Sequence, residues 1–248
     1  MLDDFCLPHL TEIIENCSLS SLEISRCNLT KSLFRTDRIK FSTTVRRSGL
    51  KYLDASYNNL SSGLETLLTS LPVGILRLDL KGCSLEPASN DLIISSLLSH
   101  CSQVSYGCDL EILNLSSLHL TDTNLERLSS CLTYCKKMTS LHIDHNCVTS
   151  RGLSFLIEAA VKESLPLCQL TCASMGASSD FWINEEKFIS DKLEAFLEKK
   201  STAQPLRFVL PSPKDGLTAS FTEVWDRYHG SKSKHHRDGL GNLVLCLD

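Results

Sequence analysis

The sequence predicts an α/β fold in which short strands and longer helices alternate along a curved solenoid. Three observations support this prediction. A pattern of spaced leucines recurs at least five times in the 248 residues. The fourth positions of successive copies lie 25 to 35 residues apart, which leaves room for a helix in each, and the intervening segments place apolar residues at helical spacing. Stacked units of this kind form a horseshoe, with parallel strands on its concave face and helices on its convex face.

Each copy follows the form L-x-x-L-x-L-x-x-N/C-x-L. Alternate strand residues point to the same side, so the leucines are expected to pack against neighbouring coils. Asparagine suits the ninth position because it can hydrogen-bond backbone groups inside the turn, and cysteine suits it because it is small and often buried. The copies contain Leu19, Leu22, Ile24, Cys27 and Leu29; Leu50, Leu53, Ala55, Asn58 and Leu60; Ile75, Leu78, Leu80, Cys83 and Leu85; Leu110, Leu113, Leu115, Leu118 and Leu120; Met138, Leu141, Ile143, Asn146 and Val148; and a degraded sixth, Leu167, Leu170, Cys172 and Met175.

Helices are expected in most of the segments that connect the copies, because apolar residues recur there every three or four positions. Residues 31–49 lack a clear apolar stripe, so no helix is expected in that segment. Residues 174–186 are predicted to form a loop that exposes Phe181 and Trp182. The predicted helices cover residues 7–17, 61–72, 90–101, 123–137, 150–163, 186–200 and 216–230.

The C-terminal part keeps a weaker version of the pattern. Leu206 and Phe208 fit a seventh strand, and Leu240, Leu243 and Leu245 fit the first, fourth and sixth positions of a last one. We therefore expect a solenoid over residues 1–202 and an atypical terminal repeat, a cap of the same solenoid, over residues 203–248. Because the chain opens inside a helix-like segment without a polar cap, we expect either a fragment of a longer protein or a first coil that packs on something else.

Composition and charge argue against nucleic-acid binding, membrane insertion and secretion. The formal net charge of −4 is small, so general electrostatic attraction to nucleic acid is not expected. The sequence has no run of about 18 apolar residues that would cross a membrane, and its start lacks the basic stretch of a secretory signal. These features predict an intracellular protein, nuclear or cytoplasmic. In that reducing environment the twelve cysteines are expected to be reduced and structural.

The third, fifth, seventh and eighth positions of each copy are expected to face away from the core, on the concave surface. At the fifth position, Glu23, Asp54 and Asp79 fall on neighbouring strands about 4.8 Å apart and form an acidic ladder. Together with nearby tyrosine and arginine, this ladder predicts a site for a protein partner with a basic surface. A simpler interpretation is that the strands are polar only because they meet water. The predicted partner-binding residues are Glu23, Tyr52, Asp54, Tyr57, Arg77, Asp79, His142 and Asp144.

No pattern in the sequence predicts catalysis, a cofactor or a metal site. His142, Asp144 and His145 lie close together, but only the first two share a strand face, and a zinc site normally needs four donors. Cys131 and Cys135 follow CxxxC spacing instead of the CxxC of zinc knuckles. The G-x-S-x-G pattern of hydrolases and the phosphate-binding G-x-x-x-x-G-K-[ST] loop are both absent. We therefore expect neither an enzyme nor a small-molecule substrate.

One short basic run, KSKHHR at residues 232–237, carries positive charge near the end of the chain. Such a run fits a nuclear address or a contact with phosphate, but it also occurs in many proteins without either role. A solvated loop between the last helix and the last strand is therefore the favoured interpretation.

The repeats resemble long leucine-rich repeats of the ribonuclease-inhibitor-like and cysteine-containing families over residues 7–175, a resemblance that implies the fold and says little about function. The cysteine-rich long repeats, the acidic start and the Trp225-bearing helix before a final strand also look similar to the C-terminal leucine-rich region of Tonsoku-like proteins. That resemblance implies a nuclear protein of replication-fork repair whose repeats hold a partner subunit. The ankyrin and tetratricopeptide parts of that family are absent, so histone binding receives no support.

The leading hypothesis is therefore a non-enzymatic scaffold that binds a protein partner on its concave face. One alternative is the substrate-recognition arm of a cullin-type ubiquitin ligase, although residues 1–20 show no F-box. Another is a leucine-rich GTPase-activating protein, in which Arg77 or Arg26 would complete the GTPase site. A tight inhibitor of a basic nuclease would also use an acidic ladder, but the modest net charge argues against it.

Overall fold

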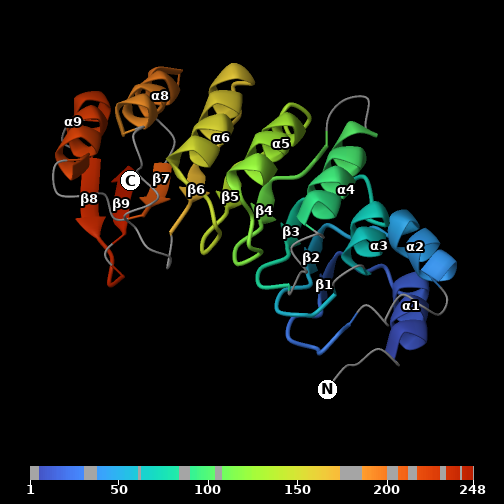
Figure 1. The fold of residues 1–248 in the computed structure, drawn as a ribbon. Helices are drawn as coiled ribbons and strands as arrows, with labels where there is room; N and C mark the ends of the chain where they lie inside the picture. The colour runs from blue at the N-terminus through green and yellow to red at the C-terminus, as the bar shows by residue number, and fades with distance from the viewer. Residues whose placement is uncertain are drawn as a thin grey trace.

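Strands and helices alternate along the chain in a computed structural model, as the sequence predicts (Figure 1). The structure describes residues 6–30, 38–60, 63–83, 90–103, 108–173, 186–199, 206–211, 217–229, 233–240 and 242–247. The strands are β1 Ser21–Glu23, β2 Tyr52–Asp54, β3 Arg77–Asp79, β4 Ile112–Asn114, β5 Ser140–His142, β6 Gln169–Thr171, β7 Leu206–Leu210, β8 Ser233–Arg237 and β9 Leu243–Leu247. The helices are α1 Leu7–Asn16, α2 Arg38–Arg47, α3 Gly63–Thr69, α4 Asn90–Ser102, α5 Asp122–Leu132, α6 Ser150–Lys162, α8 Glu186–Lys199 and α9 Leu217–His229.

All the strands join one sheet in the order β1-β2-β3-β4-β5-β6-β7-β9-β8. The first seven run parallel in chain order, whereas β9 pairs antiparallel with both β7 and β8. The helices lie along one side of this sheet, from α1 at one end to α9 at the other (Figure 1). This arrangement confirms the predicted α/β solenoid.

The leucines at the fourth position form one interior row. Leu22, Leu53, Leu78, Leu113, Leu141 and Leu170 stand opposite one another across successive strands. Phe208 of β7 continues the row. Burying each such side chain contributes about 1.5–3 kcal/mol, so the row and the coils on either side of it supply much of the stability. Leu22, on the edge strand β1, is only half-buried.

In the second and fifth copies, asparagine at the ninth position ties the coil to the one before it. Asn58 Oδ1 accepts hydrogen bonds from the backbone N–H groups of Cys27 and Leu29, at 2.9 and 3.1 Å. Its Nδ2 donates to the carbonyls of Ile24 and Ala55, at 2.7 and 2.9 Å. The side chain therefore satisfies buried backbone groups of two coils at once, because an amide offers both donors and acceptors.

The residue before the ninth position bends the chain in the same way in five coils. There the backbone adopts a left-handed conformation, with φ between 52 and 62°. Only glycine adopts this region without steric cost, so the other four positions hold some backbone strain. The residues at this turn are Arg26, Tyr57, Gly82, Ser117 and His145.

The structure corrects several details of the sequence prediction. Helix α2 forms where no helix was expected, since Phe41 and Val45, one turn apart, bury its inner face. The predicted helix over residues 123–137 begins at Asp122 and ends already at Leu132. The basic run over residues 232–237, interpreted as a loop, is mostly strand β8. The loop predicted around Phe181 and Trp182 lies outside the described residues.

The last strands also differ from the prediction in their pairing. Because β9 runs antiparallel to β7, the numbering of the parallel repeats does not carry over to it. Leu243 and Leu245 are buried as predicted, but Leu240, assigned to the first position, is 68% exposed. Trp225 of α9 is fully buried and packs edge-on against Phe208, with ring centroids 5.9 Å apart.

No disulfide joins any of the twelve cysteines, all of which lie among the described residues, and half of them are buried. None of the described helices has the length and apolar character needed to cross a membrane.

Candidate functional site

Three carboxylates stand in register on the first three strands. Glu23 pairs with Asp54 across β1 and β2, and Asp54 pairs with Asp79 across β2 and β3. Adjacent strands lie about 4.8 Å apart, which brings these like charges close together. Among the residues that the structure describes, no lysine, arginine or histidine forms an ion pair with any of the three. The acidic ladder, Glu23, Asp54 and Asp79, therefore presents uncompensated negative charge.

Local hydrogen bonds orient the aspartates of the ladder. Oδ1 of Asp54 accepts from the backbone N–H of Ser56 at 2.8 Å, and Oδ1 of Asp79 accepts from that of Lys81 at 2.9 Å. Each carboxylate thus closes a small turn at the end of its strand. Oδ2 of Asp79 also accepts from Nδ2 of Asn114 at 2.9 Å. Because these contacts hold both aspartates in place, a ligand would meet charges that are already oriented.

Tyr52 and Arg77 occupy the third position of neighbouring strands, directly opposite each other. Burial raises the pKa of the Tyr52 phenol above 10.0, the carboxylates of the acidic ladder raise it further, and Arg77 lowers it. Tyr52 is therefore a neutral hydrogen-bond donor beside the ladder at physiological pH. Arg77 is exposed, so its guanidinium is accessible to a ligand.

A second aromatic site lies on the turns that follow these strands. The guanidinium carbon of Arg26 lies 4.3 Å from the centre of the Tyr57 ring, and Nζ of Lys81 lies 5.9 Å from it. Both are cation–π distances. Tyr57 remains 41% exposed. Tyr57 was predicted from the sequence, but these two partners were not, because the turns of neighbouring coils bring them to the ring.

His142 and Asp144 belong to a separate hydrogen-bonded network around β5 and β6. The Thr171 hydroxyl donates to Oδ2 of Asp144 at 2.6 Å and lies 3.0 Å from Nδ1 of His142. A hydroxyl has one hydrogen, so Nδ1 of His142 must carry the proton that Thr171 accepts. Burial lowers the pKa of His142 below 6.5, outweighing the carboxylates of Asp144 and Asp79, which raise it. His142 is therefore neutral near pH 7.

The structure thus places the eight predicted residues on one sheet but in two groups. Six lie on or beside β1–β3, whereas His142 and Asp144 lie beyond β4. The sequence analysis missed Thr171 as the link between His142 and Asp144, although it stands at the fifth position of the next copy and so could have been found from the repeat. The first group combines negative charge with aromatic surface, and the second is largely occupied with its own hydrogen bonds.

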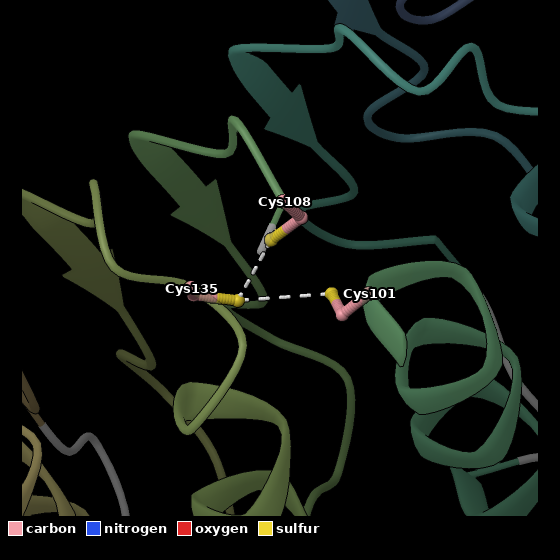
Figure 2. Close-up of side chains that lie close together, drawn as sticks. All are labelled: Cys101, Cys108 and Cys135. Carbon is pink, nitrogen blue, oxygen red and sulfur yellow. Dashed lines mark hydrogen bonds between the residues drawn. The ribbon is translucent and has the colours of Figure 1, made fainter. Parts of the chain in front are cut away.

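Three buried cysteines form a further cluster, away from the strands. Cys101, Cys108 and Cys135 bring their sulfur atoms within 4.8 Å of one another (Figure 2). The CxxxC spacing groups Cys135 with Cys131, and no signal in the sequence points to Cys108, because the partners come from different coils. Among the described residues this is the one group of histidine, cysteine or acidic side chains that could together hold a metal ion.

No family model matches the chain. Over 190 residues it is 32% identical to the Tonsoku-like protein of Bos taurus, a match that covers 73% of this chain and 14% of that protein. It is also 32% identical to the Tonsoku-like protein of Danio rerio over 170 residues, covering 65% of this chain and 11% of the relative. The human NACHT, LRR and PYD domains-containing protein 6 is 30% identical over 142 residues, a match that covers 46% of this chain and 15% of that protein.

These matches confirm that the chain is of the leucine-rich-repeat type and is related to the Tonsoku-like proteins. They also show that the chain spans only 14% and 11% of the length of the two Tonsoku-like relatives. Among solved structures, actin-binding site 2 of leiomodin-1 superposes with a TM-score of 0.50 at 14% identity, covering 67% of this chain and 87% of that one. At this identity the likeness shows the fold alone.

Proposed function

We propose that this leucine-rich-repeat chain, a relative of the Tonsoku-like proteins, is a scaffold that binds a basic segment of a protein partner on its concave face. The observation that carries the proposal is the acidic ladder. Three carboxylates stand in register without an ion pair among the described residues, beside an exposed arginine and two tyrosines. Like charges this close repel each other, and a cationic ligand would relieve that repulsion.

The aromatic residues give the proposed interface its anchors. Tyrosine and arginine are enriched among residues that dominate binding energy, because they combine a large contact area with a polar end. Tyr52 would donate a hydrogen bond to the partner from beside the carboxylates, and Tyr57 offers a ring that is already flanked by Arg26. We propose that the ladder selects the charge of the partner and that the two tyrosines supply most of the contact area.

The same proposal extends to His142 and Asp144, which would form the far margin of the binding face. Their contribution is smaller, because Asp144 already accepts the Thr171 hydroxyl and the backbone N–H of Ala173. We also propose that residues 203–248 cap the solenoid. The edge strand β8 exposes Lys234, His235 and Arg237, and charged side chains on an edge strand oppose pairing with a further chain.

The process in which the scaffold acts is proposed from its relatives. Similarity to the Tonsoku-like proteins supports a place in the nucleus, in DNA replication and repair. The chain covers a small part of those proteins, so the partner is defined here by its chemistry, as a protein with a cluster of lysine and arginine. Fluorescence microscopy of the tagged protein, in cells with and without stalled replication forks, tests this placement.

Binding to synthetic peptides tests the concave site directly. The probes are a lysine- and arginine-rich peptide and its glutamate-rich counterpart, labelled for fluorescence anisotropy. We expect the triple variant Glu23→Gln, Asp54→Asn and Asp79→Asn to bind the basic peptide more weakly, with a Kd at least tenfold higher. A matched control, Glu12→Gln, Glu126→Gln and Glu223→Gln, removes the same charge from the helices and should bind as the unaltered chain does. Equal loss in both triple variants would show a general charge effect and reject the assigned face.

A further inference from the structure

Three thiols from separate segments converge in the core between neighbouring coils. Cys101 lies near the end of α4, Cys108 precedes β4, and Cys135 lies between α5 and β5. Their exposures are 1%, 2% and 1%. Sγ of Cys135 lies 3.1 Å from that of Cys108 and 3.7 Å from that of Cys101 (Figure 2). The three sulfur atoms point toward one another, so they face a common centre and do not each pack separately.

The spacing of the sulfur atoms fits metal coordination better than a disulfide. A sulfur–sulfur bond is about 2.05 Å long, well below both distances, and would leave the third thiol without a role. Zinc binds thiolate sulfur at about 2.3 Å with tetrahedral angles, which places neighbouring sulfur atoms about 3.8 Å apart. The 3.7 Å pair already has this separation, and the 3.1 Å pair needs to open by less than 1 Å.

His100 is the candidate for a fourth donor. His100 precedes Cys101 in α4 and is 6% exposed. Its Nε2 atom is buried and has no hydrogen-bond partner among the described residues. A buried polar atom that has lost its water and gained no partner is unfavourable, so it calls for one. The His100 ring lies outside the group of three sulfur atoms and would have to turn toward them to complete the shell.

We propose that Cys101, Cys108 and Cys135 bind one zinc ion, with Nε2 of His100 as the fourth ligand. Three cysteines and one histidine form a common structural zinc set, and thiolates favour soft metals over magnesium or calcium. On binding, the three thiols release three protons to solvent, and the resulting site carries a net charge of −1. The ion would join the coil of α4 and β4 to the coil of α5 and β5, where the Cys108 N–H already donates to the Tyr134 carbonyl at 2.9 Å.

Metal analysis of the unaltered chain is the first test. The protein is expressed with zinc in the medium and purified under reducing conditions without chelator, and its metal content is measured by mass spectrometry. We expect one zinc per chain, released when a mercurial reagent titrates the thiols. After replacement by cobalt(II), the absorption spectrum should show thiolate charge-transfer bands and the intense bands of a tetrahedral site. Absence of metal, copper in place of zinc, or a Cys108–Cys135 disulfide in the native mass spectrum would overturn the proposal.

Variants then locate the ion. Cys108→Ser should reduce the zinc content severalfold, whereas Cys83→Ser and Cys172→Ser, which alter equally buried thiols in other coils, should retain it. If Cys108→Ser fails to fold, the cobalt spectrum of the unaltered chain still decides whether thiolates bind the metal. His100→Phe should weaken zinc binding but preserve the thiolate charge-transfer bands. Full zinc retention in Cys108→Ser would reject the thiol site, and unchanged affinity in His100→Phe would reject the fourth ligand.

Discussion

Oδ2 of Asp144 accepts the hydroxyl hydrogen of Thr171 at 2.6 Å, across the boundary between two repeats. This bond leaves the Thr171 oxygen as an acceptor only, so it fixes the proton of His142 on Nδ1. A side chain in one coil therefore sets the tautomer of a histidine in the coil before it. The same relation recurs at Asn58, whose amide satisfies backbone groups of the preceding coil, so polar contacts as well as the leucine row hold the stack together.

The first prediction concerns the pH dependence of stability through His142. Its folded pKa is lowered by burial, whereas the unfolded chain has the ordinary value near 6.5. Below that pH the unfolded state binds the proton more readily than the folded state. His142 therefore costs no stability above about pH 6.5, and it lowers the free energy of unfolding progressively as the pH falls toward the folded pKa. His142→Asn keeps an N–H donor for Thr171 but does not titrate. Urea titrations at pH 7.5 and 5.5 should show a smaller loss in this variant, and an equal loss would contradict the assignment.

The second prediction concerns Asn146, which repeats the role of Asn58. Its Oδ1 accepts from the N–H groups of Leu118 and Leu120, at 2.9 and 3.1 Å, and its Nδ2 donates to the carbonyls of Leu115 and Ile143, at 3.0 and 2.9 Å. Asn146→Ala leaves these buried groups unpaired and should lower the free energy of unfolding by about 2–4 kcal/mol. Urea denaturation followed by circular dichroism measures this loss.

Cysteine at the same position provides a graded control for Asn146. In the third copy Cys83 donates to the Ala55 carbonyl at 3.3 Å, so a thiol can satisfy one of these groups. Asn146→Cys is therefore expected to lose less stability than Asn146→Ala. Equal losses would mean that the size of the side chain, and not its hydrogen bonds, decides the preference for asparagine.

The sequence revealed those features that depend on the repeat itself. The interior row from Leu22 to Leu170 and the polar fifth positions follow from counting along each copy, because parallel strands in register place equal positions side by side. Helix α2 was missed because Phe41 and Val45 are its only buried apolar residues, so the surrounding arginine and threonine hide the helical pattern. Leu240 was wrongly assigned to the first position of a repeat because β9, which follows it, runs antiparallel, so the positions of the parallel repeats do not apply there.

Contacts between residues at unlike positions of the repeat could not be read from spacing alone. Thr171 reaches Asp144, which stands two positions further along its own copy, from 27 residues away, and Cys135 meets Cys108 from 27 residues away. Such pairs depend on the rotation between coils and on the path of each connecting segment. The acidic ladder was predictable because its members share one position, whereas the thiol cluster was not, because its members occupy a helix and two connecting segments.

The third prediction concerns Gly82, the one glycine among the left-handed turns described above. A Cβ atom added there would lie 2.7 Å from Cδ1 of Tyr57, and the backbone has φ of 62°. Gly82→Ala should therefore cost about 1–2 kcal/mol and push the Tyr57 ring away from Arg26. Stability and binding of the basic peptide should both decrease, as measured by thermal unfolding and fluorescence anisotropy.

Two variants separate strain from other effects of this change. Gly239→Ala adds the same methyl group where nothing lies within 4 Å, so it should leave stability unchanged or slightly raised. Ser117→Gly relaxes a left-handed turn with φ of 58° and should not destabilise the fold. If Gly82→Ala behaved like Gly239→Ala, the contact between Gly82 and Tyr57 would have no role in shaping the surface.

The last prediction tests whether the terminal strands open apart from the rest of the solenoid. Trp225 is fully buried, packs against Phe208, and donates from Nε1 to the Cys246 carbonyl at 3.3 Å. Trp225→Ala removes a large core side chain and should cost about 3–5 kcal/mol. In a solenoid each coil contacts mainly its neighbours, so the loss should concentrate in β7 and β9. Hydrogen exchange should therefore speed up in residues 206–210 and 243–247 and stay unchanged in β4. Trp225→Phe, which keeps an aromatic ring but loses the hydrogen bond, should show a smaller effect. Faster exchange in β4 as well would mean that the cap and the repeats unfold as one cooperative unit.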